Sequence, residues 1–106
     1  MRYITTFKLK EILDIGEPVQ IIDTRDPGKY NECHVPGAIN IPQIDLPDNL
    51  DKVSREIPVV VYCLYGVKSD APFLYLREKA KIRNVYILEG GLFQWATDID
   101  QTMPIL

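Results

Sequence analysis

The chain has 106 residues, of which 46% are hydrophobic and 25% charged, and its formal net charge is −3. This length and balance predict one globular domain over residues 1–106 and exclude a disordered chain. The acidic balance gives no general attraction to nucleic acid or to an anionic membrane, so neither is an expected partner. No apolar run is long enough for a signal peptide or a membrane span, and two cysteines are too few for a secreted disulfide scaffold. We therefore expect a cytoplasmic protein with reduced thiols.

Short β-rich runs alternate with helical stretches, which is typical of an α/β domain with a mostly parallel sheet. The expected elements, in chain order, are a strand at Tyr3–Thr5, a helix capped by Thr6 and ending near Ile15, a strand at Val19–Asp23, a helical turn at Asp26–Tyr30, a strand at Ala38–Ile41, a helix at Leu46–Val53, a strand at Val59–Tyr62, a helix capped by Ser69 and ending near Lys81, a strand at Val85–Leu88 and a helix at Leu92–Thr97. The run Val59–Tyr62 is the strongest strand and is expected at the centre of the sheet.

The segment most informative about function is Cys63–Ser69, which joins that strand to the next helix. Ligands of open α/β sheets bind outside the carboxyl ends of the strands, which is where Cys63 is expected. Backbone N–H groups of a tight loop containing Gly66, the start of the following helix and the charge of Lys68 would together favour a thiolate. The same groups would also hold a persulfide or a sulfonate. The alternative is that Cys63 only ends a buried strand, and this loop alone leaves both interpretations open.

Three segments, taken in order, resemble the signatures of rhodanese domains. They are Ile22–Asp26 with Tyr30 and His34–Pro42, then Cys63–Ser69, and finally Val85–Trp95. The resemblance implies a rhodanese-like three-layer α/β/α domain with a central five-stranded, mostly parallel sheet. It also implies a sulfurtransferase that moves a sulfane sulfur from a donor, thiosulfate or a protein persulfide, to a thiophilic acceptor through a persulfide on Cys63.

The resemblance implies Cys63 as the catalytic nucleophile and the rest of its loop as the substrate-binding set: Leu64, Tyr65, Gly66, Val67, Lys68 and Ser69. Arg25 is a further candidate at the rim of the site, because Asp23 ends a strand at the same sheet edge; a structural ion pair between these two residues is the alternative. His34 precedes a Pro-Gly turn and is expected to bond to backbone. No cofactor and no metal are expected.

The chain departs from the rhodanese pattern at three places. Lys68 stands where arginine is common, which replaces a bidentate grip on an oxyanion by a point charge. Leu64 and Tyr65 make the mouth of the loop more apolar, so the preference for thiosulfate is in question. Cys33 stands where glycine is usual; we interpret it as a substituted turn residue, with a resolving thiol as the alternative.

The segment from Leu92 to Ile105 resembles the end of rhodanese domains fused behind E1-like adenylyltransferases. Such domains pass sulfur to a small ubiquitin-like carrier protein. The resemblance thus implies a small donor such as thiosulfate, or a cysteine desulfurase, and a ubiquitin-like sulfur carrier as candidate partners. It does not identify the physiological donor or acceptor, the oligomeric state, or whether the chain is free-standing.

Two other functions are compatible with this fold class. A rhodanese-fold interaction module without activity usually lacks the cysteine, so Cys63 argues against it. A cysteine-dependent phosphatase or arsenate reductase needs a longer loop that ends in arginine. Here Ser69 is the sixth residue after Cys63 and the loop's cation is Lys68, which disfavours that interpretation.

Overall fold

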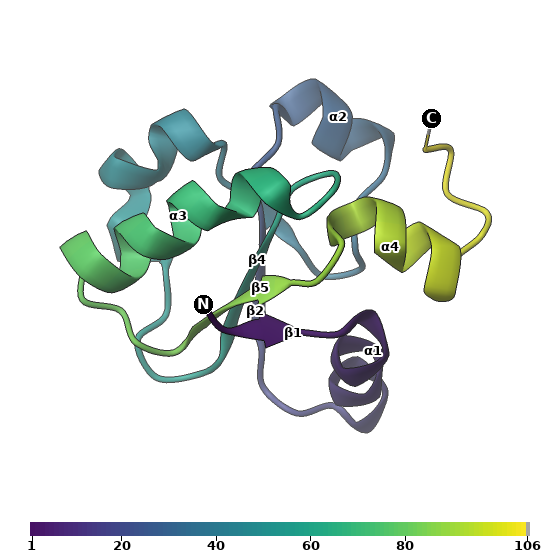
Figure 1. Ribbon diagram of the computed structural model, residues 1–106, viewed down its shortest axis with the longest axis horizontal. Coiled ribbons are helices and arrows are strands. Elements are labelled where there is room, and N and C mark those ends of the chain that lie inside the picture. The colour runs from purple at the N-terminus through teal and green to yellow at the C-terminus, as the bar shows by residue number, and fades with distance from the viewer. Residues whose placement is uncertain (106) are drawn as a thin grey trace.

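The computed structural model describes residues 1–105, whose strands form one sheet in the order β1-β5-β4-β2-β3 (Figure 1). The strands are β1 (Tyr3–Ile4), β2 (Gln20–Asp23), β3 (Ile39–Asn40), β4 (Val59–Tyr62) and β5 (Val85–Leu88). Every pairing in this sheet is parallel, and the sequence had predicted a mostly parallel one. The central position expected for Val59–Tyr62 is confirmed, because β4 lies between β5 and β2.

Helices cover both faces of the sheet. They are α1 (Thr6–Ile15), α2 (Pro27–Glu32), the 3-10 helix η1 (Gln43–Lys52), a continuous run of η2 (Val67–Ser69), α3 (Asp70–Leu74) and η3 (Tyr75–Lys79), and α4 (Gly91–Asp98). The rhodanese-like α/β/α architecture implied by the sequence is therefore present. No helix within residues 1–105 has both the length and the apolar composition needed to cross a membrane.

The core has two layers, one on each face of the sheet. Val59 and Val61 of β4 pack into the layer beneath η1 and α3, whereas Val60 and Tyr62 pack into the layer beneath α1 and α4. Side chains of a strand alternate between faces, so a strand covered on both sides must be apolar at every position. All four residues of β4 are fully buried, which explains why this run has no polar residue other than the tyrosine hydroxyl.

Two caps differ from those expected. Thr5, not Thr6, caps α1, because its hydroxyl accepts a hydrogen bond from the Lys8 N–H at 3.1 Å. Thr6 is buried inside the helix and donates to Asp98 in α4 at 2.6 Å. Ser69 makes no capping bond, since its φ of −78° and ψ of −12° are already helical and a capping residue needs an extended backbone.

Two expected helices have a different geometry. The helix predicted at Leu46–Val53 is the 3-10 helix η1 that begins at Gln43 and is kinked at Asn49. It contains Pro47, which lacks the N–H that an α-helical bond would use. The helix predicted up to Lys81 ends in the wider π-helical turn η3, and Lys81 follows with a positive φ of 59°.

Candidate active site

A pocket of about 810 Å³ opens at the carboxyl edge of the sheet. In the register of β2 and β4, Asp23 pairs with Tyr62, so that Thr24 and Cys63 leave the sheet beside each other. The Thr24 N–H donates to the Tyr62 carbonyl at 3.0 Å, which extends this alignment one residue beyond the strands. The pocket is lined by Thr24, Arg25, Asp26, Lys29, Glu32, Cys33, Pro42, Gln43, Ile44, Pro47, Cys63, Leu64, Lys68, Pro104 and Ile105.

Cys63 is the first residue after β4, and the loop that follows folds back over its sulfur. The side chain is only 5% exposed, yet the residue lines the pocket. The backbone N–H of Gly66 donates to the Cys63 Sγ at 3.2 Å. Gly66 makes this return possible because its φ of 87° lies in the left-handed region that favours glycine. Within residues 1–105 the sulfur thus has one backbone donor, where the sequence had led us to expect several N–H groups of the loop.

The start of α4 supports the loop from beneath. The N–H of Leu92 donates to the Cys63 carbonyl at 2.9 Å, and the N–H of Phe93 donates to the Leu64 carbonyl at 2.8 Å. These amides belong to the first turn of a helix, where N–H groups have no partner within the helix. Gly91 packs so tightly here that a Cβ would lie 2.5 Å from the Cys63 carbonyl oxygen. The Gly90-Gly91 pair at the start of α4 is the sequence signal from which this close contact could have been predicted.

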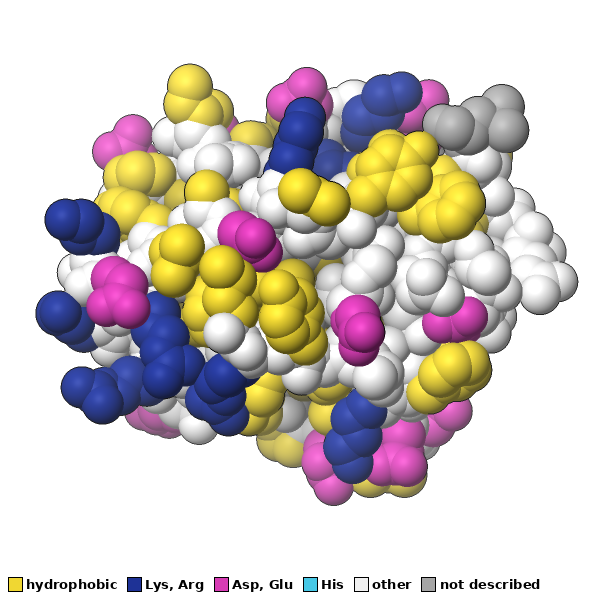
Figure 2. Space-filling view, in the orientation of Figure 1, with side chains coloured by type: hydrophobic (Ala, Val, Ile, Leu, Met, Phe, Trp, Pro, Cys, Tyr) yellow, Lys and Arg dark blue, Asp and Glu magenta, His cyan; other side chains and the backbone are white. Residues whose placement is uncertain are grey.

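Part of the substrate-binding set expected from the sequence lines the pocket. Leu64, Lys68 and Arg25 line the pocket together with Cys63. Tyr65 and Val67 do not; they are 56% and 75% exposed, and the Tyr65 ring packs against Phe93 with ring centroids 5.4 Å apart. The sequence placed both residues in the substrate-binding set, and that assignment stays a prediction. In Figure 2, hydrophobic side chains gather near the start of α4, beside basic side chains.

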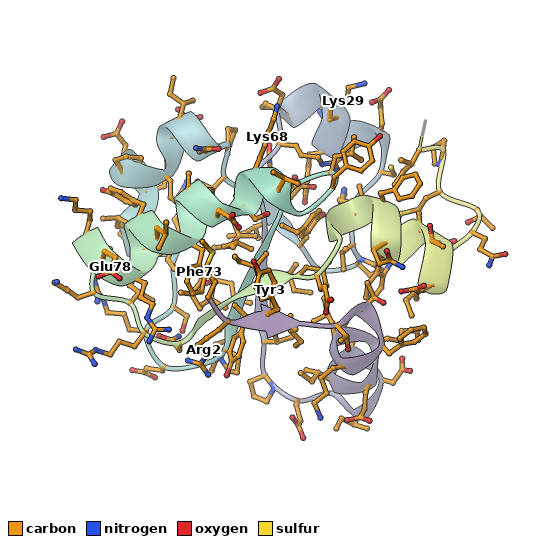
Figure 3. All side chains as sticks on the ribbon, in the orientation of Figure 1. Arg2, Tyr3, Lys29, Lys68, Phe73 and Glu78 are labelled. Carbon is orange, nitrogen blue, oxygen red and sulfur yellow. The ribbon has the colours of Figure 1, made fainter. Side chains whose placement is uncertain are left out.

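Lysine side chains from two elements reach this pocket. Lys68 lies in η2, and Lys29, which sequence reasoning missed, lies in α2; Figure 3 shows both on the same edge of the molecule. Lys29 pairs with Glu32 at 3.5 Å, whereas Lys68 has no acidic partner within salt-bridge distance among residues 1–105. The pocket therefore contains a lysine, Lys68, that belongs to the loop of Cys63 and has no acidic partner within residues 1–105.

Arg25 has both roles that the sequence left open. Its guanidinium pairs with the fully buried Asp23 at 2.7 Å and donates to the Cys33 carbonyl at 2.6 Å, and the residue also lines the pocket. Burial opposes its charge, but the hydrogen bond and charge of Asp23 outweigh burial and raise the pKa of Arg25. Through the ion pair with Asp23 and the hydrogen bond to Cys33, Arg25 links β2 to the end of α2 at the pocket wall.

Ser69 and His34 are held in different ways. Ser69 is fully buried, and its hydroxyl has no hydrogen-bond partner within the described part of the chain. His34 Nδ1 lies 2.8 Å from the Tyr30 carbonyl oxygen, and the two rings stack at 3.8 Å between centroids. The prediction that His34 bonds to backbone is confirmed.

Sequence reasoning also missed the pocket wall opposite the loop of Cys63. Pro42, Ile44 and Pro47 supply one apolar side from η1 and its approach, and Pro104 and Ile105 supply another from the C-terminal segment. The two groups lie far apart in the sequence. Their shared position follows only from the packing of the chain.

Comparison with known proteins agrees with this geometry. The model of the rhodanese-like domain family matches residues 5–98. The thiosulfate sulfurtransferase GlpE of Shewanella oneidensis is 35% identical over 80 residues, which cover 76% of this chain and 78% of GlpE. A crystal structure of a rhodanese-like domain protein from Staphylococcus aureus superposes with a TM-score of 0.83 at 32% identity and covers 100% of this chain and 99% of that one. The chain belongs to the rhodanese-like domain family, in which its relatives are named sulfurtransferases.

Another relative is much longer than this chain. The "Probable adenylyltransferase/sulfurtransferase MoeZ" of Mycobacterium tuberculosis is 34% identical over 102 residues, which cover 94% of this chain. The same alignment covers only 26% of MoeZ. The similarity to MoeZ thus extends through nearly all of this chain.

Proposed function

We propose that this domain, residues 1–106, is a catalytically active sulfurtransferase that carries a sulfane sulfur as a persulfide on Cys63. The observation that carries the proposal is the Gly66 N–H aimed at the Cys63 Sγ at 3.2 Å, in a pocket that also contains Lys68. A backbone donor and a nearby cation stabilise an anionic sulfur, whether it is a thiolate or a persulfide. A cysteine that merely ended a strand would not need an open pocket.

With thiosulfate as donor, the Cys63 thiolate attacks the outer sulfur. The S–S bond of thiosulfate breaks, sulfite leaves with the electron pair, and a persulfide anion remains on Cys63. Lys68 attracts the sulfonate oxygens before transfer. Because a lysine is a point charge, we expect weaker orientation of the sulfonate than an arginine would give.

Ser69 supports the same step. A buried hydroxyl without a hydrogen-bond partner destabilises the fold by about 1–3 kcal/mol. Such a hydroxyl is therefore kept where a bound group supplies the missing partner. The hydroxyl of Ser69 is buried without a partner in residues 1–105. We propose that it donates to the outer sulfur once Cys63 is loaded.

The volume of the pocket bears on the donor and acceptor. Thiosulfate has five heavy atoms, whereas pockets of about 300–1,000 Å³ accommodate ligands of drug size. The pocket of about 810 Å³ therefore has room for a larger partner group. A protein persulfide on a cysteine desulfurase fits as donor, and the C-terminal end of a ubiquitin-like sulfur carrier fits as acceptor. The cytoplasm, which keeps thiols reduced, is the compartment in which we expect this chemistry.

The test is intact-mass analysis before and after incubation with thiosulfate, on the wild-type chain and on Cys63→Ser. We expect a gain of one sulfur atom that disappears in the variant and after addition of cyanide, which accepts the sulfur. A gain that persists in Cys63→Ser would overturn the mechanism. If neither thiosulfate nor a loaded cysteine desulfurase adds sulfur to the wild-type chain, the domain is a non-catalytic module.

A further inference from the structure

The two cysteines of this chain lie on the wall of the same pocket. Cys63 follows β4 and Cys33 follows α2, and both are free. The sequence contains no third cysteine. The fold therefore brings both thiols of the chain to one site from segments that are distant in the sequence.

The two thiols differ in access. Cys63 is 5% exposed beneath its loop, whereas Cys33 is half-buried. A small donor can reach Cys63 through the pocket. A bulky acceptor reaches the more exposed Cys33 more easily.

Cys33 also has a cation beside it. Arg25 Nη2 donates to the Cys33 carbonyl oxygen at 2.6 Å, and the Arg25 side chain lines the same pocket. Burial lowers the pKa of Arg25, and the hydrogen bond and charge of Asp23 raise it. The charges of Tyr62 and then of Cys33 make smaller contributions in the same direction as Asp23. The hydrogen bond from Arg25 fixes the backbone of Cys33 at the pocket wall, and the thiolate is the form of a cysteine that attacks a persulfide.

We propose that Cys33 is a second sulfur-carrying residue, which takes the sulfane sulfur from Cys63 and presents it to a protein acceptor. The Cys33 sulfur attacks the outer sulfur of the Cys63 persulfide, the S–S bond on Cys63 breaks, and a new S–S bond forms on Cys33. The proton of the Cys33 thiol passes to the released Cys63 thiolate, so no oxidant or reductant is consumed. This proposal rests on the proposed function, because it requires the Cys63 persulfide.

The experiment follows one sulfur atom within the wild-type chain. The protein is loaded with one equivalent of thiosulfate, trapped with an alkylating agent at successive times, and digested with trypsin without reduction. Cys33 and Cys63 then lie in separate fragments, Tyr30–Lys52 and Glu56–Lys68. We expect the sulfur first in the Cys63 fragment and later in the Cys33 fragment. Sulfur in neither fragment would contradict the proposed function, whereas sulfur that stays on Cys63 alone would overturn only the transfer to Cys33.

Two variants make the test specific. In Cys63→Ser we expect no sulfur on Cys33, and direct loading of Cys33 would overturn the transfer order. The matched control is Cys33→Ser with Asn31→Cys, since residue 31 lies in α2 two residues before Cys33 and in the same tryptic fragment, but is exposed and outside the pocket. We expect no sulfur on the cysteine at position 31, and equal loading there would show that the pocket has no role.

Transfer between molecules is measured by mixing loaded Cys33→Ser with unloaded Cys63→Ser. Two thiols in one chain meet at an effective concentration on the order of 1 mM. At about 10 μM protein, transfer within a chain should therefore be about 100-fold faster than transfer between chains. Equal rates in the mixture and in the wild-type chain would overturn the proposal.

Discussion

Ser69 is the residue at which stability and function are expected to conflict. Its hydroxyl is fully buried and unpaired within residues 1–105, so it does not stabilise the free protein. Natural proteins retain such strained or unsatisfied groups mainly at functional sites. Ser69 therefore distinguishes an active loop from one that is only folded.

Ser69→Ala should leave the free energy of unfolding unchanged or raise it by up to about 1 kcal/mol, because an unsatisfied buried group is removed. Sulfur transfer should fall about tenfold or more, since a hydrogen bond to an anionic sulfur contributes about 1.5–3 kcal/mol. Denaturant unfolding and the rate of persulfide formation measure the two effects on the same preparation. A variant that loses stability but keeps its rate would show that the hydroxyl serves packing.

Tyr62 makes the fold sensitive to high pH. Its hydroxyl accepts a hydrogen bond from the Val35 N–H at 3.1 Å beneath the pocket. Burial, and then the charge of Asp23, raise the pKa of Tyr62 far above its ordinary value of about 10. The folded state therefore holds this proton more tightly than the unfolded state does.

The stability contributed by this raised pKa is fully present below about pH 10 and is lost as the pH rises above it, because only the unfolded chain releases the proton there. Tyr62→Phe should be less stable at pH 7 by about 1–3 kcal/mol, since the Val35 N–H loses its buried acceptor. Between about pH 10 and 12 the stability of this variant should fall less steeply than that of the wild type. Urea unfolding across this range checks both statements, and parallel slopes would contradict the assignment to Tyr62.

At the scale of elements, α4 holds the loop of Cys63 in place. Its first-turn amides donate to the carbonyls of Cys63 and Leu64. The loop geometry therefore depends on a helix that starts at Gly91, 28 residues after Cys63. Gly91 has a φ of 64°, and a Cβ there would meet three backbone atoms of the loop at 2.5–2.7 Å. Backbone atoms cannot move aside as a flexible side chain can.

Gly91→Ala should therefore displace the loop, lower the free energy of unfolding by about 1–3 kcal/mol and reduce persulfide formation by tenfold or more. Gly28→Ala in α2 is the matched control, because a Cβ there meets nothing within 4 Å. That control should be neutral or slightly stabilising. Thermal unfolding and the rate of sulfur loading measure both variants; equal behaviour would contradict the proposed support of the loop by α4.

At the scale of the whole molecule, the C-terminal segment completes the pocket. The family match ends at residue 98, yet Pro104 and Ile105 line the pocket, and Met103 and Ile105 pack against the core layer beneath α1 and α4. In Figure 1 the chain after α4 turns back toward α2. This segment should therefore influence which donors bind rather than the transfer step.

Ile105→Ser should raise the KM for a donor that fills the pocket, such as glutathione persulfide, by about 5- to 10-fold, because burial of part of an isoleucine contributes about 1 kcal/mol or more. The KM for thiosulfate should change by less than about twofold, since a small anion leaves most of the pocket wall untouched. The matched control is Ile15→Ser, an isoleucine that is 61% exposed and lies outside the pocket. An equal rise in KM for both donors would show a general loss of structure instead.

The amino-acid order was enough to predict the fold class and the place of Cys63 at the carboxyl edge of the sheet. Alternation of strands and helices predicted the parallel α/β domain, because a strand covered on both faces must be apolar throughout, as Val59–Tyr62 is. The strand, loop and helix around Cys63 are contiguous in the sequence, so their order alone predicted a thiol at the carboxyl edge of the sheet. Helix ends were less predictable, as the shift of the cap from Thr6 to Thr5 illustrates.

Only the tertiary structure decided which other residues surround that thiol. Leu64 and Lys68 line the pocket, whereas Tyr65 and Val67 of the same loop have exposed side chains on either side of the turn at Gly66. Cys33, Lys29 and Ile105 lie far from Cys63 in the sequence, and long-range packing places them on the wall of the same pocket. Local patterns report on residues adjacent in the chain, whereas a pocket is formed by residues that only the folded core brings together.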